Sequence, residues 1–291
     1  VTGTGANLAY ATHAAGTVAA YTPSGTSTNA SGLPNDPTAN WQIGAAAGTA
    51  PSTVSVNTLR YTNPSTQRTT PGSSFTVNGV LNAGGFWTIG ASNNSSTVTT
   101  GSAGEFVVAT ATGNVGFDAA ILESVAGTGL TFISQGGSLI LSNTIGFSGP
   151  INAMGGNLTI AGSGTVASIN LSGSALTVGG TALSQQIGSI AGVGSSLTKA
   201  NSGTTTLSVT NSYTGTTSIQ NGTLVVSSLP SIGTAGGLGN PTSANATISL
   251  GSLTTTGVLR YVGAGDTTDR NFALAGTTGG GGIEASGAGA L

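Results

Sequence analysis

The chain has 291 residues, of which five are Lys or Arg and seven are Asp or Glu, so charged residues make up 4% and the net charge is −2. Soluble domains usually carry about 25% charged residues. A charge this small excludes electrostatic binding of nucleic acid or acidic ligands. The absence of cysteine excludes disulfides and thiolate metal sites, whereas a hydrophobic content of 37% can supply a continuous core.

Two further classes of protein are excluded by the pattern of residues. The 50 glycines do not occupy every third position, as a collagen helix requires. No apolar run approaches the ~18 residues of a membrane-spanning helix, so we expect no transmembrane segment. Residues 1–4 have no basic region and no initiator Met, and we expect the chain to be a processed or internal piece of a longer polypeptide.

Residues 1–72 are expected to form an irregular N-terminal cap, because most of the prolines and the first Trp lie there. A helix is not expected in this segment. The Ala-rich stretch 38–50 is interrupted by Gly44 and Gly48 and is followed by Pro51, all of which disfavour a helix.

Residues 73–229 contain a short alternating unit that recurs between Gly, Asn, Ser and Pro turns. Its four clearest copies are 138–141, 157–160, 175–178 and 196–199, and their leucines lie 19, 18 and 21 residues apart. Period-two segments bounded by such turns predict β-strands. Two all-β architectures remain open, a β-sandwich and a parallel β-helix (β-solenoid) of about 20 residues per coil.

The parallel β-solenoid is the favoured fold. Its repeat is about twice a hairpin spacing, its apolar positions recur in register, and Asn and Thr recur where stacked coils can form ladders. Parallel crossovers are almost always right-handed, so the predicted coil is right-handed.

Residues 197–226 carry a more specific pattern. It starts with Leu-x-Lys at Leu197, reaches Asn-x-Tyr-x-Gly at Asn211 and ends with Gly-x-Leu-x-Val at Gly222. This pattern resembles the autotransporter-associated β-strand repeat of large bacterial surface proteins. Asn201 stands where that repeat usually has glycine. The resemblance implies a secreted β-helical stalk or passenger of a Gram-negative-type bacterium, with no catalytic or ligand residues to carry over.

The lysine and the tyrosine of this pattern are expected to have ordinary structural roles. Lys199 belongs to the Leu-x-Lys start, and Tyr213 is expected to cover a coil corner with its hydroxyl in water. Two neighbouring positions also depart from the repeat, because Val209 replaces a usual glycine and Thr205 a usual leucine.

Residues 230–291 are expected to form a loop, rich in Gly and Pro up to residue 241, followed by further solenoid coils. Val258 to Tyr261 repeats the Leu-Arg-Tyr of Thr58 to Tyr61. The densest charge cluster follows, with Asp266 and Asp269 beside Arg270. We interpret it as a solvated loop in which Asp266 caps a turn and Arg270 or Arg260 neutralises the pair. A Ca²⁺ site or a glycoside-cleaving pair is the alternative.

Other candidates for chemistry are isolated. His13 has no adjacent carboxylate and is interpreted as a surface or capping residue. Asp118 and Glu123 are interpreted as loop charges at a strand end. Trp87 and Trp41 could stack on sugars, but alternating strands favour core or cap packing. We therefore assign no catalytic, cofactor-binding or metal-binding residue and expect no cofactor and no enzymatic activity.

The expected function is structural: an extracellular stalk or fibre subunit on the surface of a Gram-negative-type bacterium. Its few charges and proline-free C-terminal strands predict self-association, end to end or by strand donation. The alternative is an adhesin or carbohydrate-binding autotransporter passenger with surface glycans as partners.

Overall fold

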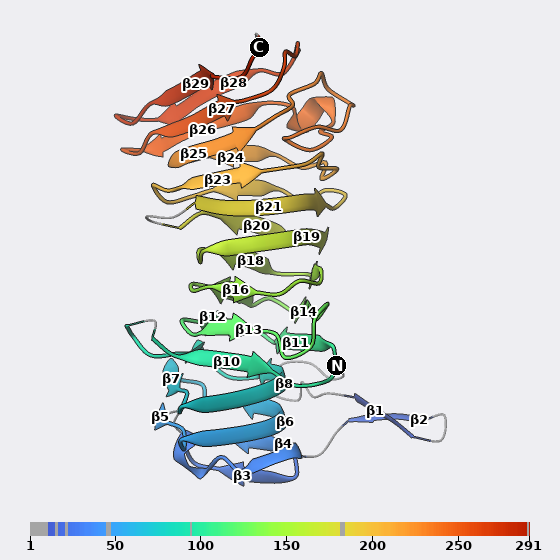
Figure 1. The fold of residues 1–291 in the computed structure, drawn as a ribbon, viewed down its shortest axis with the longest axis vertical. Helices are drawn as coiled ribbons and strands as arrows, with labels where there is room; N and C mark the ends of the chain where they lie inside the picture. The colour runs from blue at the N-terminus through green and yellow to red at the C-terminus, as the bar shows by residue number, and fades with distance from the viewer. Residues whose placement is uncertain are drawn as a thin grey trace. The chain divides into compact units, whose positions relative to one another are not determined.

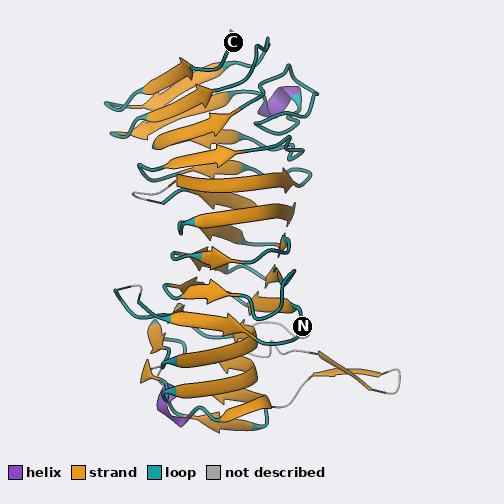
Figure 2. Ribbon diagram, viewed as in Figure 1, coloured by secondary structure: helices purple, strands orange, loops and turns teal. Residues whose placement is uncertain are grey.

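The structure is a computed structural model that describes residues 11–14, 17–20, 23–44, 48–93, 95–180, 184–289 and 291. In these residues it is almost entirely β (Figure 2), with two 3-10 helices, η2 (Ala30–Gly32) and η3 (Ser243–Asn245). Neither helix has the length and apolarity needed to span a membrane, nor does any other helix of the described residues. The chain divides into two compact units, Val1–Gly156 (unit 1) and Asn157–Leu291 (unit 2).

Unit 1 is a stack of parallel strands in two sheets (Figure 1). One sheet runs β3-β4-β6-β8 and then divides, because β8 pairs with both β10 and β11. The divided parts continue as β10-β13-β16 and β11-β14-β17, and the second sheet runs β5-β7-β9-β12-β15. The strands are β1 (Ala11–Ala14), β2 (Thr17–Ala20), β3 (Gly25–Ser27), β4 (Asn35–Ile43), β5 (Gly48–Thr49), β6 (Thr53–Tyr61), β7 (Gln67–Thr70), β8 (Ser74–Asn82), β9 (Trp87–Ile89), β10 (Thr97–Thr100), β11 (Glu105–Thr110), β12 (Val115–Phe117), β13 (Ala120–Leu122), β14 (Gly129–Ser134), β15 (Ser138–Leu141), β16 (Ile145–Gly146) and β17 (Ile151–Met154).

Unit 2 repeats this architecture with one strand of each sheet per coil. Its sheets run β19-β21-β23-β25-β27-β29 and β18-β20-β22-β24-β26-β28. The strands are β18 (Asn157–Ile160), β19 (Gly164–Ser172), β20 (Ala175–Val178), β21 (Ser184–Ala191), β22 (Leu197–Lys199), β23 (Thr204–Leu207), β24 (Thr217–Ile219), β25 (Gly222–Val226), β26 (Ile248–Leu253), β27 (Gly257–Tyr261), β28 (Phe272–Gly276) and β29 (Gly281–Ala285).

Each unit is therefore a parallel β-solenoid, and the predicted fold class is confirmed. A sandwich would need antiparallel ladders, whereas among the described strands only β1 and β2 form one. The repeating units were placed correctly: β18, β20 and β22 stack in register, which aligns Leu158, Leu176 and Leu197 in one buried column. The handedness of the coil stays a prediction.

The core follows from the period of two. In β6, the side chains of Val54, Val56, Leu59 and Tyr61 are at most 1% exposed, and the residues between them face outward or are half-buried. Successive coils place apolar residues on apolar residues, so the interior is one continuous column in each unit. In unit 1 the rings of the buried Phe106 and Phe117 meet edge to face with centroids 5.7 Å apart.

The expected side-chain ladder is present in unit 1. Asn57 Nδ2 donates to Asn40 Oδ1 at 3.1 Å, and Asn78 Nδ2 donates to Asn57 Oδ1 at 3.0 Å, so the ladder links β4, β6 and β8. Strands β4 and β6 lie inside the segment predicted to be an irregular cap, and they already pair in parallel. The predicted boundaries near residues 72 and 229 stay predictions.

Candidate functional site

A groove opens on the outer face of unit 1, over β6 and β8. The regular pairing of the sheet is interrupted on each side of these two strands. β6 and β8 are nine residues long. On one side, β4 shifts its register with β6 between Asp36 and Asn40, so that the bulge carries Pro37 to the edge of the groove. On the other side β10 ends at Thr100 and the chain turns. The groove has a volume of about 310 Å³.

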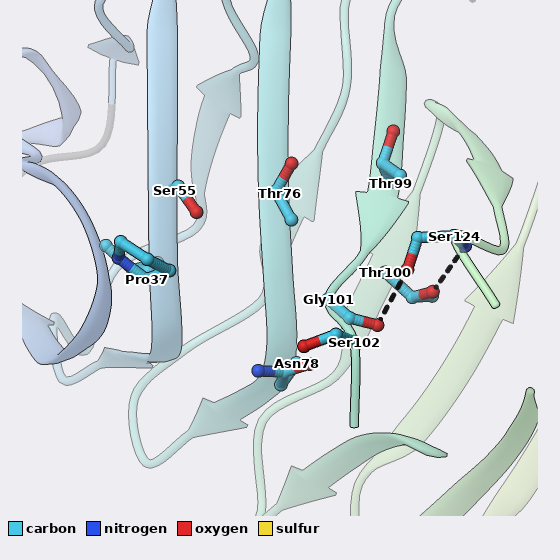
Figure 3. A pocket seen from close by; sticks show the side chains of 10 residues that line it. Pro37, Ser55, Thr76, Asn78, Thr99, Thr100, Gly101, Ser102 and Ser124 are labelled. Carbon is cyan, nitrogen blue, oxygen red and sulfur yellow. Dashed lines mark hydrogen bonds between the residues drawn. The ribbon is translucent and has the colours of Figure 1, made fainter. Parts of the chain in front are cut away.

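The floor of the groove is a row of three hydroxyl groups (Figure 3). Ser55 on β6 is paired with Thr76 on β8, and Thr76 is paired with Thr99 on β10. Adjacent members of the row are therefore about 4.8 Å apart, the spacing of neighbouring strands. Within the described part of the chain, these three hydroxyls have no protein partner.

The rim beside Thr99 is held by hydrogen bonds. The Ser124 amide donates to Thr100 Oγ1 at 3.1 Å, and Ser124 Oγ donates to the Gly101 carbonyl at 2.9 Å (Figure 3). Asn78, at the end of the asparagine ladder, accepts a hydrogen bond from the Ala103 amide at 3.3 Å. The groove is thus bounded by groups that already have partners and is largely preformed.

Gly101 is needed where the rim meets the ladder. A Cβ atom at this position would lie 2.1 Å from Asn78 Oδ1, and Asn78 cannot rotate freely because both its Nδ2 and its Oδ1 are hydrogen-bonded. Only glycine allows the turn to approach the strand this closely.

No ionisable side chain lines the groove. Asp36 lies next to the rim residue Pro37. Its Oδ1 already accepts hydrogen bonds from Thr38 Oγ1 and from the Thr38 amide, within the turn that Asp36 begins. These bonds lower the pKa of Asp36. The surface offered to a ligand is consequently neutral and rich in hydroxyls.

The predicted aromatic residues do not supply a sugar platform in this groove. Trp87 is fully buried, stacks on Tyr61 with ring centroids 5.1 Å apart and donates from Nε1 to Thr69 Oγ1, so its core assignment is confirmed. Trp41 is half-buried, lies over Gly25 and donates from Nε1 to Ser27 Oγ.

The expectation for Tyr213 is wrong. Its side chain is 0% exposed and its hydroxyl lies 2.9 Å from Thr217 Oγ1. The corner is covered by the loop that follows β25, since the Asn240 amide donates to the Tyr213 carbonyl and Gly239 lies against its ring. Sequence spacing places the ring at a corner but does not show that a later loop covers it.

The charge cluster after β27 fixes that loop. Asp266 Oδ2 accepts from the Leu229 amide at 2.7 Å, and Asp269 Oδ1 accepts from the Ile232 amide at 2.8 Å. Each carboxylate therefore binds backbone, and within the described residues no three His, Cys, Asp or Glu side chains lie close enough to hold a metal.

Of the two arginines expected to neutralise this cluster, Arg270 interacts with it and Arg260 has another partner. Arg260 pairs instead with Glu284, at 2.6 Å. Arg270 is 5% exposed and donates to the carbonyls of Ala246 and Leu238. It also interacts electrostatically with Asp269: burial lowers the pKa of Arg270, and the nearby Asp269 charge opposes that lowering.

The remaining predicted charges have structural partners. Asp118 forms a 2.7 Å salt bridge with Arg68, and Glu123 accepts hydrogen bonds from the amide and the hydroxyl of Ser148. His13 lies in β1, opposite Val18 of β2, and its side chain lies outside the described residues.

Lys199 has a role that the sequence did not reveal. Its side chain is 0% exposed in the interior column between Val178 and Ile219. Its ammonium donates to the carbonyls of Ala200, Asn201 and Asn221, at 2.6, 2.6 and 3.0 Å. It joins two successive coil corners of unit 2. The Leu-x-Lys pattern located Lys199 in the repeat but did not indicate that its side chain is buried.

We expect the stability of unit 2 to be greatest near pH 10. Burial lowers the pKa of Lys199 from 10.5 to about 8. Between about pH 8 and pH 10 the folded chain has therefore lost this proton while the unfolded chain still holds it. Because the unfolded chain binds more protons, the free energy of unfolding rises in this range, by about 1 kcal/mol per pH unit. Burial raises the pKa of Tyr213 from 10.0 to about 12, which reverses the trend above pH 10. Urea unfolding followed by circular dichroism would measure both limbs. Lys199→Met should remove the rise and leave the fall, and an unchanged rise would contradict this assignment.

The parallel strand pairing in both units places the chain in the class of parallel β-solenoids. Residues 197–226, which form β22 to β25, match the passenger-associated-transport-repeat. Over 160 residues the chain is 32% identical to the Adhesin BmaC autotransporter of Brucella suis biovar 1 (strain 1330). This match covers 54% of the chain and 4% of that adhesin. No solved structure matches the chain significantly.

These similarities confirm the predicted resemblance: the chain carries a passenger-associated repeat and is a distant relative of an autotransporter adhesin. The Asn201 departure also has a physical reason. Asn201 has φ +61°, and asparagine is one of the few residues other than glycine that adopt this conformation readily. It therefore preserves the corner that the repeat requires.

Proposed function

We propose that the chain is an adhesive passenger segment displayed on the surface of a Gram-negative bacterium. The single observation that carries the proposal is the preformed, uncharged groove of unit 1 on a rigid solenoid. The relationship to an autotransporter adhesin supports it. A sheet face can present binding groups without the entropy loss that follows when a loop becomes ordered on binding.

The surface location rests on the same relationship. Passenger-associated repeats and the autotransporter relative both favour export through a Gram-negative envelope. The continuous parallel ladders of both units and the low charge suit a stalk that holds its shape without disulfides. Adhesion rather than a purely structural role is favoured because the stalk function does not account for a groove with unpaired hydroxyls.

The proposal predicts that beads coated with residues 1–291 attach to cell surfaces. We expect attachment to epithelial cell layers in a flow chamber above the level of beads coated with a heat-unfolded sample of the same chain. Free chain added in solution should compete for attachment. Equal retention of folded and unfolded coatings would overturn the adhesive function, and attachment that the free chain does not reduce would do the same.

A second proposal, self-association of residues 1–291 into fibres, rests on the coil formed by β28 and β29. There, residues that continue the interior columns are uncovered: Leu274 follows Leu250 and is 72% exposed, and Ile283 follows Leu259 and is 46% exposed. A second copy that adds a coil to this face would bury both side chains and pair the free edges of β28 and β29.

A further inference from the structure

We propose that the groove of unit 1 binds an extended, neutral, linear oligosaccharide along the row Ser55, Thr76 and Thr99. This inference rests on the proposed adhesive function and names its ligand class and its contact residues. It is carried by three features of the groove: the free hydroxyl row, the fixed rim and the absence of charge.

The first feature is the repeat of the row. Hydroxyls on three consecutive coils lie in register across β6, β8 and β10, at about 4.8 Å per step. From Pro37 on β4 to Ser124 beyond β13 the groove crosses five coils, or roughly 19 Å. A linear glycan presents a new set of hydroxyls with every sugar ring, so several of its rings can meet successive members of the row.

The second feature is the chemistry of the row. A hydroxyl both donates and accepts one or more hydrogen bonds, and sugar hydroxyls do the same. In the described part of the chain, Ser55, Thr76 and Thr99 have no competing protein partner. Pro37 adds a small apolar surface for the CH face of a sugar. A ligand with a formal charge would find no counter-charge among the lining residues.

An extended peptide is the less suitable occupant. Peptides commonly bind sheets by adding a strand to a free edge, where backbone groups are unpaired. The floor of the groove is a sheet face, and the backbones of β6, β8 and β10 are already paired with one another. A peptide would therefore lose its main-chain hydrogen bonds, whereas a glycan binds through groups that match the exposed side chains.

The expected affinity is weak for one site. The groove is shallow and its lining contains no aromatic ring, and exposed hydroxyls exchange hydrogen bonds with water at small net gain. We expect a dissociation constant on the order of 1 mM. Many copies on one bacterial surface would convert such sites into firm attachment.

The test is a titration of ¹⁵N-labelled residues 1–291 with maltohexaose, cellohexaose and mannohexaose, with hexagalacturonate as the charged comparator. We expect at least one neutral hexasaccharide to shift the amide signals of Ser55, Thr76 and Thr99, and hexagalacturonate to leave them in place. Thr76→Val removes one hydroxyl and keeps the side-chain shape, so it should weaken binding by about three- to tenfold.

The matched control is Thr177→Val. Thr177 is a half-buried, outward-facing residue of β20 in unit 2 with an equivalent strand environment. It should bind like the unchanged chain. Equal effects of the two variants, shifts that lie outside the groove, or no shift with any neutral hexasaccharide would each overturn the inference. If beads nevertheless attach to cells, the adhesive function stands with another ligand, and binding of an uncharged peptide in place of the glycans would identify that class.

Discussion

Replacing Gly257 with Ala is expected to destabilise unit 2 by about 3 kcal/mol or more. Gly257 begins β27 and lies against Ile219, the last residue of β24. A Cβ atom there would lie 1.7 Å from the Ile219 carbonyl oxygen and 2.8 Å from the Gly251 amide nitrogen. Both are backbone atoms, so no side-chain rotation can relieve the overlap. The coils must separate, and the ladder between β25 and β27 is then lost.

The measurement is amide hydrogen exchange, because a stack of coils can open locally without unfolding completely. Protection should fall in β25 and β27 and stay unchanged in unit 1. Gly282→Ala, one coil further on, is the control: its Cβ would lie 3.5 Å from Val258 Cγ2, an ordinary contact, and it should change protection little. Similar losses in both variants would show that close approach of the backbone is not the cause.

The strands were predictable because the coil repeats its own pattern. Leucine positions 158, 176 and 197 are separated by nearly constant intervals, and in the structure these residues occupy one column. Alternation gives each strand an inside and an outside, and the repeat length sets which strands are neighbours. The Asn57 ladder could be anticipated in kind for the same reason, since stacking places like residues together.

Corner residues were less predictable, because their environment depends on segments that are distant in sequence. Lys199 is buried since the carbonyl of Asn221, on the next coil, completes its set of acceptors. Tyr213 is covered by residues near Gly239, which leave the coil after β25. The same is true of one strand residue: Thr205 of β23, where the repeat usually has leucine, is buried against Gln185, to which it donates a hydrogen bond at 3.2 Å. Each contact crosses about 20 residues or more.

The groove could not be found from the sequence. Ser55, Thr76 and Thr99 are three among many Ser and Thr residues, and nothing in their neighbours marks them. Their alignment depends on the pairing of β6, β8 and β10, and the groove around them depends on the bulge in β4 and on the division of the sheet after β8. An uncharged site carries no cluster of acids, histidines or aromatics that a pattern could detect.

Leu274→Glu is expected to abolish the proposed end-to-end association. In residues 1–291, Leu274 and Ile283 project from the uncovered face of the coil formed by β28 and β29, where each would be buried by an added coil. A carboxylate there would lie without a partner against apolar side chains, and such burial is strongly unfavourable. The same association should survive about 1 M NaCl, because backbone hydrogen bonds and apolar contacts are insensitive to a Debye length of ~3 Å.

Sedimentation velocity over rising protein concentration would test this expectation. The unchanged chain should form species larger than a monomer, Leu274→Glu should remain monomeric, and Val193→Glu should behave like the unchanged chain. Val193 is a suitable control because it is 88% exposed in unit 2 but lies at a turn after β21, where no interior column ends. A chain that stays monomeric at every concentration would refute fibre formation. Dissociation in high salt would instead show that charge, and not the uncovered Leu274 and Ile283, holds the copies together.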